Sequence, residues 1–184
     1  MKNQKNQLRK QILKQRNQLS FSQWQNKSVQ ICQNLKKHDL FIESKTVLAY
    51  FSFASEPDFS SLFALKKWGF PRCINNSLTW HFWQPPQLLE TNKYGIAEPL
   101  ADTPQIEPQQ VDLMLVPTVA CDYRGYRLGY GGGYYDRFLS SSQWQNIPTV
   151  GIVFDFAFLP QIPVEPWDTK LNYICTESIF KATN

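Results

Sequence analysis

Three runs of apolar residues constrain the fold of this chain more than any other feature. They read "KTVLAYFSF" at 45–53, "VDLMLVP" at 111–117 and "IPTVGIVF" at 147–154. Each run is rich in β-branched or aromatic residues and is apolar at almost every position, which is typical of strands buried on both faces. Such strands occur in parallel sheets whose two faces are covered by helices, so we expect an α/β fold.

Two helices are expected before the first of these strands. Leu8 and Ile12 have the i, i+4 spacing of an amphipathic helix, which we predict over about 4–18. Ser20 or Ser22 can cap a second helix that runs to about residue 37. Its core-facing residues are predicted to be Val29, Cys32 and Leu35.

The remaining elements complete the predicted fold. Pro57 and Gly69 are placed to begin and to stop a helix over about 59–68. The strings "FPRCI" and "LTWHFW" predict two strands joined by the turn "NNS", "YYDRFLSSS" predicts a helix, and "LNYICTESIF" allows a last strand and a turn. Residues 84–110 hold five of the twelve prolines and are expected to form a long irregular connection. We therefore predict a three-layer sandwich around a mostly parallel, Rossmann-like sheet with N-terminal helices, and residues 1–184 as a single domain.

Composition excludes several classes of protein. Apolar residues make up 42% of the chain and charged residues only 18%, so a folded core is expected rather than disorder. No stretch approaches the roughly 20 apolar residues of a membrane span, and we expect no membrane partner. The start "MKNQKNQLRKQ" lacks the apolar region of a secretory signal. The four cysteines are far apart in sequence, which argues against a zinc site and favours reduced thiols in a cytoplasmic protein.

The N-terminal segment is strongly basic. Residues 1–40 contain nine Lys or Arg residues and one acid, which predicts attraction to a polyanion, a phosphorylated small molecule or the acidic remainder of the chain. Lys5 and Arg9 are four residues apart and share a helix face, where two cations could clamp phosphates. A solvated basic face stays open as the alternative. Aromatic residues do not interleave with these charges, so we expect no nucleic-acid partner.

The segment "RLGYGGGYYDR" at 127–137 is the strongest candidate for chemistry, because four of the eight glycines fall within five positions of it. Glycines after a strand and before a helix let backbone N–H groups converge on phosphate, and Arg127 can balance its charge. Asp136 would suit a Mg²⁺ ion held between it and phosphate oxygens. Tyr134 stands where a Walker loop needs lysine and where a dinucleotide loop needs a third glycine, so neither motif is present. A structural glycine turn stays open on these residues alone.

Glu56 is a second candidate, because it closely follows the first predicted buried strand. If the strands are parallel, this carboxylate faces the same edge of the sheet as the glycine-rich residues 127–137. An ionised carboxylate only accepts hydrogen bonds, so Glu56 could bind the N–H groups of a ligand. The alternative is an acid that complements the start of the following helix.

Taken together, these segments resemble the 5-formyltetrahydrofolate cyclo-ligase family, whose members are also called methenyltetrahydrofolate synthetases. The resemblance rests above all on "YRLGYGGGYYDRFL", which is highly specific. It also includes "KNQLRK" with Arg16 and "LS" at 19–20, "SEPD", "YGIAEP", "VDLMLVP" and "VEPWDTKLNYICTE", and it therefore spans essentially the whole chain.

The resemblance implies an enzyme that uses ATP and Mg²⁺ to convert 5-formyltetrahydrofolate to 5,10-methenyltetrahydrofolate, with release of ADP and phosphate. ATP would phosphorylate the formyl oxygen, and N10 would then close the ring. Its small-molecule partners would be a reduced folate and ATP, and we expect a monomer. The ATP site implied by the resemblance comprises Lys5, Arg9, Arg127, Leu128, Gly129, Tyr130, Gly131, Gly132, Gly133, Tyr134 and Tyr135.

The resemblance also assigns roles to five side chains. Glu56 and Tyr94 would bind the folate, Asp136 and Asp168 would bind Mg²⁺, and Arg127 would be catalytic by stabilising the transferring phosphoryl group. No dedicated nucleophile is needed, because phosphoryl transfer depends on positioning and charge neutralisation.

Three positions depart from the family pattern. Thr118 and Cys121 lie in "PTVACD" where the family reads "PGLAFD", and Gly132 stands where some members have a lysine. These changes are expected to affect affinity and rate more than the type of reaction.

Two rival functions stay open. One is another ATP-dependent ligase or kinase that acts on a different substrate. The other is a non-catalytic module whose basic helix docks on nucleic acid or an acidic partner. Such a module does not require Glu56, the glycine segment and Asp168 in one chain.

Overall fold

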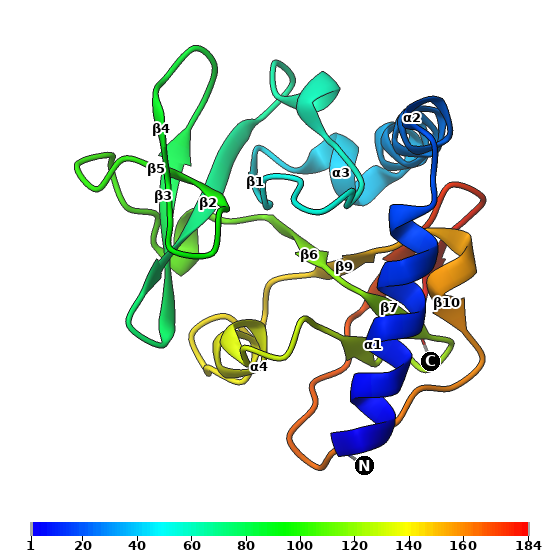
Figure 1. Ribbon diagram of the computed structural model, residues 1–184. Helices are drawn as coiled ribbons and strands as arrows, with labels where there is room; N and C mark the ends of the chain where they lie inside the picture. Colours follow the sequence, from blue (N-terminus) through cyan, green and yellow to red (C-terminus); the bar gives the residue numbers. More distant parts are fainter. Residues whose placement is uncertain (1, 184) are drawn as a thin grey trace.

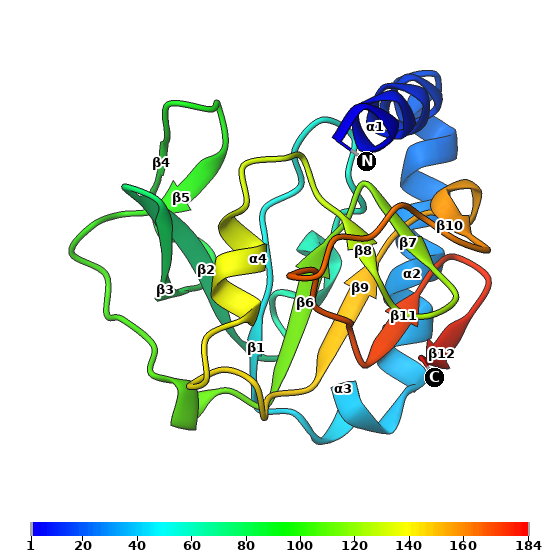
Figure 2. The same ribbon diagram turned by 90° about the horizontal axis from the view of Figure 1, so that it is seen from below.

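The computed structural model describes residues 2–183, and a seven-stranded sheet is its central element. The strand order is β12-β11-β9-β6-β1-β2-β3 (Figure 2). The five inner strands pair in parallel, and β3 and β12 pair antiparallel at the two edges. The strands are β1 (Thr46–Leu48), β2 (Lys67–Ile74), β3 (Ser77–Trp83), β6 (Leu113–Pro117), β9 (Thr149–Ile152), β11 (Tyr173–Cys175) and β12 (Phe180–Ala182).

Helices cover both faces of this sheet and give the predicted three layers. They are α1 (Lys2–Asn17), α2 (Phe21–Lys37), α3 (Asp39–Glu43) and α4 (Tyr134–Leu139). Along β6, Leu113 and Leu115 pack into the hydrophobic cluster of α2 and α3, whereas Met114 and Val116 pack into the cluster of α1 and α4. Figure 1 shows α3 and α4 on opposite sides of β6 and β9. The side chains of β6 alternate between two cores, which confirms a strand buried on both faces.

The N-terminal helices are confirmed, with one correction to the core face of α2. Ser20 caps α2: its hydroxyl accepts from the backbone N–H of Gln23, whose side chain accepts from the N–H of Ser20. Val29 is 44% exposed, so its predicted place in the core is wrong. The buried stripe has the spacing i, i+3, i+4 and i+7 and consists of Ser28, Ile31, Cys32 and Leu35.

The helix predicted over 59–68 is also wrong. Only a single 3-10 turn, η1 (Ser60–Leu62), forms there, and the chain then enters β2. Trp68 and Phe70, two residues apart, both pack into the cluster beneath α2 and α3. Gly69 does not stop a helix but allows close packing in the strand, since a Cβ there would lie 2.5 Å from Leu48 Cδ2.

Several short strands escaped prediction. The connection 84–110 contains a hairpin of β4 (Leu89–Thr91) and β5 (Ala97–Pro99) and the 3-10 turn η2 (Pro108–Gln110), so it is not wholly irregular. A small second sheet joins β7 (Ala120–Asp122) to β8 (Arg127–Leu128) and to β10 (Phe158–Leu159), which follows the 3-10 turn η3 (Asp155–Ala157). The tail forms two strands, not one. In Figure 2 the segment between β8 and α4 runs between the β4–β5 hairpin and α1.

The cysteines match the expectation of unpaired thiols. All four are free; Cys32, Cys121 and Cys175 are buried, and Cys73 is partly exposed. Among residues 2–183, none of the helices combines the length and hydropathy that crossing a membrane requires.

Candidate active site

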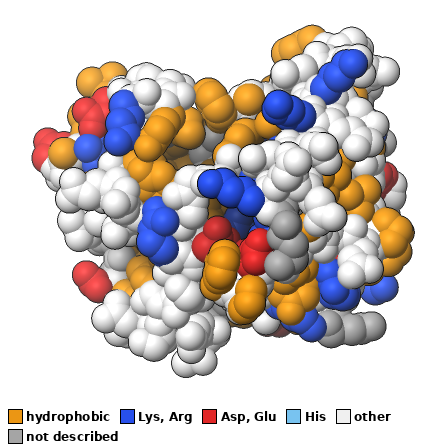
Figure 3. Space-filling view, turned by 60° about the horizontal axis from the view of Figure 1, so that its bottom comes forward, with side chains coloured by type: hydrophobic (Ala, Val, Ile, Leu, Met, Phe, Trp, Pro, Cys, Tyr) orange, Lys and Arg blue, Asp and Glu red, His pale blue; other side chains and the backbone are white. Residues whose placement is uncertain are grey.

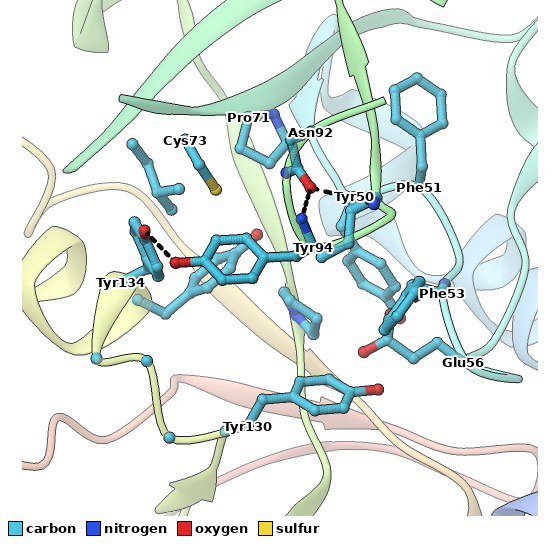
Figure 4. A pocket seen from close by; sticks show the side chains of 18 of the residues that line it. Tyr50, Phe51, Phe53, Glu56, Pro71, Cys73, Asn92, Tyr94, Tyr130 and Tyr134 are labelled. Carbon is cyan, nitrogen blue, oxygen red and sulfur yellow. Dashed lines mark hydrogen bonds between the residues drawn. The ribbon is translucent and has the colours of Figure 1, made fainter. Parts of the chain in front are cut away.

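A cavity of about 470 Å³ opens at the carboxyl ends of β1 and β6. In open α/β sheets this edge is where ligands bind. Its wall comes from the chain after β1, the β4–β5 hairpin, α1 and the glycine segment, which we define as residues 129–133 (Figure 4). The lining residues are Arg9, Tyr50, Phe51, Phe53, Glu56, Pro71, Cys73, Leu78, Asn92, Tyr94, Ile96, Glu98, Pro117, Arg127, Gly129, Tyr130, Gly131, Gly132, Gly133, Tyr134, Tyr135 and Asp136.

The cavity combines an aromatic wall with charged groups. Figure 3 shows a hollow lined largely by hydrophobic side chains, with basic and acidic side chains grouped along its lower border. Most of the predicted site residues line this cavity. Three do not: Lys5 and Asp168 pair with each other, and Leu128 lies in the core at 1% exposure.

The glycine segment is held against the N-terminal helix. Nε of Arg9 donates to the carbonyl oxygen of Gly129 at 2.7 Å. Gly131 and Gly133 have φ values of 103° and 70°, in the left-handed region that disfavours any residue with a Cβ. Gly133 is also the residue before α4. The segment therefore turns sharply while its bare backbone faces the cavity.

Arg127 is the first residue of β8, and its side chain lines the cavity. Its side chain is only 4% exposed, and its NH2 group donates to Oδ1 of Asp136 at 2.5 Å. The guanidinium lies over the ring of Tyr135, 5.4 Å from the ring centroid. A Cβ on Gly129 would lie 2.8 Å from NH1 of Arg127, so this glycine makes room for the arginine.

The two predicted metal ligands are each paired with a cation. Oδ2 of Asp168 accepts from Nζ of Lys5 at 2.5 Å and from the backbone N–H of Glu165 at 2.8 Å. Asp136 pairs with Arg127. Burial lowers the pKa of Arg9, whereas Asp136 and Asp168 both raise it, so both carboxylates lie within electrostatic range of one guanidinium.

This donor set fits a Mg²⁺ ion that arrives with phosphate. Residues 2–183 contain no group of three or more His, Cys, Asp or Glu side chains arranged for a metal. Mg²⁺ is commonly bound by one or two carboxylates, with substrate phosphates and water completing its coordination. The carboxyl oxygens of Asp136 and Asp168 suit this chemistry, whereas a protein-only metal cage is not formed.

Glu56 is buried at the floor of the cavity, at 4% exposure. Its Oε2 accepts from the backbone N–H of Phe53 at 3.2 Å, and its Oε1 lies 3.8 Å from NH1 of Arg16. Burial raises the pKa of Glu56 to about 7, although Arg16, the Phe53 N–H and Tyr130 all oppose this rise. The carboxyl is therefore poised to change charge near neutral pH.

Arg16 is a residue of this region that the sequence reasoning did not single out as a site. It is 2% exposed, and its guanidinium donates to the Tyr130 hydroxyl at 2.8 Å and to the Thr118 carbonyl oxygen at 3.3 Å. Its spacing could have indicated it, because Arg16 is seven residues from Arg9 and four from the buried Ile12. This basic face of α1 therefore packs against the rest of the protein.

Several buried polar atoms in the cavity have no protein partner. Within residues 2–183, five buried side-chain polar atoms lack a hydrogen bond, and four belong to residues that line the cavity. An unsatisfied buried polar atom costs about 1–3 kcal/mol, so their grouping indicates a ligand that both donates and accepts. These four atoms are the hydroxyls of Tyr50 and Tyr135, Oε1 of Glu56 and Nε of Arg127.

A pair of tyrosines joins the hairpin to the start of α4. The hydroxyls of Tyr94 and Tyr134 lie 3.1 Å apart, and the Tyr134 hydroxyl also donates to the carbonyl oxygen of Asn75 at 3.0 Å. Figure 4 shows Tyr94 and Tyr134 meeting across the cavity from Glu56. Tyr94 thus forms the wall opposite the buried carboxylate.

The charge of Glu56 should make stability depend on pH. An unfolded chain releases this proton near pH 4.5 and the folded chain near pH 7, so the free energy of unfolding falls as pH rises between these values. Glu56→Gln stays neutral, so its stability relative to wild type should rise by about 3 kcal/mol between pH 4.5 and pH 8. Urea unfolding at both pH values measures the difference, and a difference that stays constant would contradict the raised pKa.

Comparison with known proteins identifies the family and the fold that this chain resembles. The profile of the 5-formyltetrahydrofolate cyclo-ligase family matches residues 1–177. The NMR structure of the Aquifex aeolicus 5,10-methenyltetrahydrofolate synthetase superposes with a TM-score of 0.85 at 31% identity, over 97% of this chain and 92% of the other. A Mycoplasma pneumoniae synthetase of the same name has a TM-score of 0.75 at 26% identity, over 94% and 98% of the two chains.

A curated relative matches over a shorter segment. The 5-formyltetrahydrofolate cyclo-ligase of Escherichia coli is 37% identical over 97 residues, which are 52% of this chain and 53% of that protein. This alignment thus spans about half the length of that relative. The family match, in contrast, runs through both N-terminal helices, the glycine segment and β11, and the predicted α/β fold is confirmed. The chain belongs to the 5-formyltetrahydrofolate cyclo-ligase family.

Proposed function

We propose that this protein converts 5-formyltetrahydrofolate to 5,10-methenyltetrahydrofolate, with ATP as co-substrate and ADP and phosphate as further products. One observation carries the proposal: a single cavity holds the buried Glu56 together with Arg9, Arg127 and the glycine segment. One part of this cavity suits a flat ligand with N–H groups, and another suits a polyphosphate.

The folate would occupy the part of the cavity next to Glu56. An ionised Glu56 accepts hydrogen bonds only and would bind the N–H donors of the pterin. Phe51, Phe53 and Tyr94 supply aromatic surface for a flat ring. A volume of about 470 Å³ is within the usual range for a small-molecule site.

ATP would lie along the glycine segment. Its phosphates would approach the bare backbone between Arg9 and Arg127. Lys5, which pairs with Asp168, would be a third cation near the phosphates. We propose Asp136 and Asp168 as the residues that hold Mg²⁺; when bound, the ion would neutralise part of the charge of the triphosphate.

The reaction follows from the chemistry of the formyl group. A formamide is a poor electrophile, because its nitrogen donates electrons to the carbonyl. Transfer of the γ-phosphoryl group to the formyl oxygen turns that oxygen into a leaving group. N10 then attacks the formyl carbon, the C–O bond breaks, the N10 proton is released and phosphate leaves with the formyl oxygen. Arg127 would stabilise the transferring phosphoryl group.

The basic helix argues against a non-catalytic docking module. Lys5 pairs with Asp168, Arg9 bonds Gly129 and Arg16 bonds Tyr130, so these three cations bind within the protein. We further propose a cytoplasmic monomer whose partners are a reduced folate and ATP. The four unpaired thiols support this location.

An absorbance assay tests the proposed function. Purified protein, 5-formyltetrahydrofolate and Mg-ATP should produce the methenyl absorption band together with equal amounts of ADP and phosphate. Omitting ATP or Mg²⁺ should abolish the band. ATP hydrolysis without methenyl product would favour a kinase or ligase that acts on another substrate.

Gly131 offers a test of the nucleotide side. Alanine at this position would be strained by about 1–2 kcal/mol, because φ is 103° there. In Gly131→Ala the free segment can relax to relieve this strain, and ATP must restore the strained conformation, so we expect ATP binding to weaken by up to about tenfold while folate binding changes little. Isothermal titration calorimetry measures both affinities.

Gly132→Ala is the matched control. Gly132 has no positive φ, and an added Cβ would make one close contact, 3.1 Å from the ring of Tyr134. Its effect on ATP binding should be smaller. Equal effects of the two substitutions would contradict a conformational role for Gly131.

A further inference from the structure

Arg16 is a buried cation outside the cavity that contacts two of its lining residues, Tyr130 and Glu56, and the backbone at Thr118. It comes from α1, its side chain is 2% exposed, and it lies outside the set of residues that line the cavity. Its NH1 group is 2.8 Å from the Tyr130 hydroxyl and 3.8 Å from Oε1 of Glu56, and NH2 is 3.3 Å from the Thr118 carbonyl oxygen. Burying a guanidinium is costly unless its partners replace the lost water, so these contacts are needed to hold Arg16 in place.

The contacts of Arg16 join the two halves of the cavity. Tyr130 belongs to the glycine segment, whereas Glu56 lies in the chain that follows β1. Both side chains line the cavity, and Figure 4 shows their polar ends converging at its floor. A shift of Arg16 would therefore move both the Glu56 carboxylate and the glycine segment.

We propose that Arg16 is a positioning residue that keeps Glu56 ionised as a hydrogen-bond acceptor and fixes its place relative to the glycine segment through Tyr130. The substrate that benefits is one that presents N–H donors to Glu56, so the proposal rests on the proposed folate role of that residue. Arg16 itself does not contact the reacting atoms.

Arg16 is the one positively charged group among the described residues that act on the Glu56 carboxylate. The groups that act on Glu56 or respond to its charge are Arg16 from α1, Tyr50 after β1, Tyr130 of the glycine segment and Tyr135 of α4. Burial raises the pKa of all three tyrosines, and the charge of Glu56 raises them further. These phenols stay neutral near pH 7, so among the described groups Arg16 alone opposes the burial of Glu56 with a positive charge.

Loss of Arg16 should therefore change the pH at which Glu56 ionises. In Arg16→Gln, burial still raises the pKa of Glu56, but the opposing cation is gone, so the pKa should move further upward. The acid limb of kcat/KM for 5-formyltetrahydrofolate should shift to higher pH. At pH 7 the KM for folate should rise about 10- to 100-fold, with a smaller change in kcat at higher pH.

Two further variants separate charge from shape. Arg16→Lys keeps the positive charge but loses the planar fork, so it should restore most of the pH profile but only part of the affinity. Lys14→Gln removes an exposed charge from the same helix and should leave both the profile and the KM unchanged. A merely structural role of Arg16 would lower stability and rate without moving the acid limb.

The decisive experiment is an NMR titration of ¹³C-labelled Glu side chains, with Glu56 assigned by its loss in Glu56→Gln. It is performed on wild type, Arg16→Gln and Arg16→Lys in parallel with the kinetics. We expect Glu56 to titrate at a higher pH in Arg16→Gln and close to the wild-type pH in Arg16→Lys. If Arg16→Gln does not fold, a Glu56 titration in Arg16→Lys far from that of wild type contradicts the charge role.

The outcomes separate this proposal from the proposed function. An unchanged Glu56 titration in folded Arg16→Gln would overturn the role of Arg16, whether or not wild type is active. An inactive wild type whose Glu56 responds to Arg16 as expected would overturn the folate reaction and leave the Arg16–Glu56 coupling in place.

Discussion

Arg127→Ala is expected to lower the turnover number by about 100- to 1,000-fold. The arginine is the first residue of β8, 4% of its side chain is exposed, it lines the cavity, and its buried Nε has no hydrogen-bond partner in the protein. A fixed cation at this point can stabilise negative charge that develops as the phosphoryl group moves. The effect should appear mainly in kcat, measured from the rate of methenyl formation at saturating substrates.

Two controls make the Arg127 result specific. Arg127→Lys keeps a positive charge without the planar fork, so it should retain more activity than alanine. Circular dichroism and thermal unfolding should show that both variants fold, since the partner Asp136 is 38% exposed and can be solvated. Near-normal ATP-dependent cyclisation by Arg127→Ala would remove Arg127 from the catalytic machinery.

Glu56→Gln should weaken binding of 5-formyltetrahydrofolate by about 100- to 1,000-fold and leave ATP affinity nearly unchanged. Glutamine keeps the shape of the side chain but replaces one acceptor oxygen with a donor NH₂ group. The pterin N–H groups would then face a donor inside a buried site, which is costly. Calorimetric titration with folate and with ATP measures the two affinities separately.

Glu177→Gln is the matched control for this substitution. Glu177 is also a buried carboxylate, but it pairs with Lys27 and accepts from the Asp155 N–H, away from the cavity. This variant should lose stability while its folate affinity stays at the wild-type value. If Glu56→Gln binds folate as tightly as wild type does, the assignment of the pterin to this carboxylate is wrong.

The fold was predictable where a long run of apolar residues reflects a strand that is buried on both faces. The runs at 111–117 and 147–154 are apolar on both faces because β6 and β9 lie at the centre of the sheet, between two cores. The β4–β5 hairpin escaped prediction because β4 is exposed at all three positions and shows no alternation. Gly69 was misinterpreted because a glycine that ends a helix and one that admits Leu48 in a strand look alike in sequence.

The cavity was predictable in part. Parallel strands bring Glu56 and the glycine segment to one edge, and both line the same cavity. Arg16 was not assigned a role, because a basic residue on a basic amphipathic helix looks like a solvated one, and only packing shows that it is 2% exposed. The pairing of Asp168 with Lys5, 163 positions apart, likewise depends on tertiary structure.

The fate of the formyl oxygen tests the proposed reaction most directly. The enzyme would be supplied with 5-formyltetrahydrofolate labelled with ¹⁸O in the formyl group, together with unlabelled Mg-ATP. Phosphorylation of that oxygen predicts one ¹⁸O atom in the released inorganic phosphate for each methenyltetrahydrofolate formed, measured by mass spectrometry. Unlabelled phosphate alongside methenyl product, or ATP consumption with no methenyl product, would contradict it.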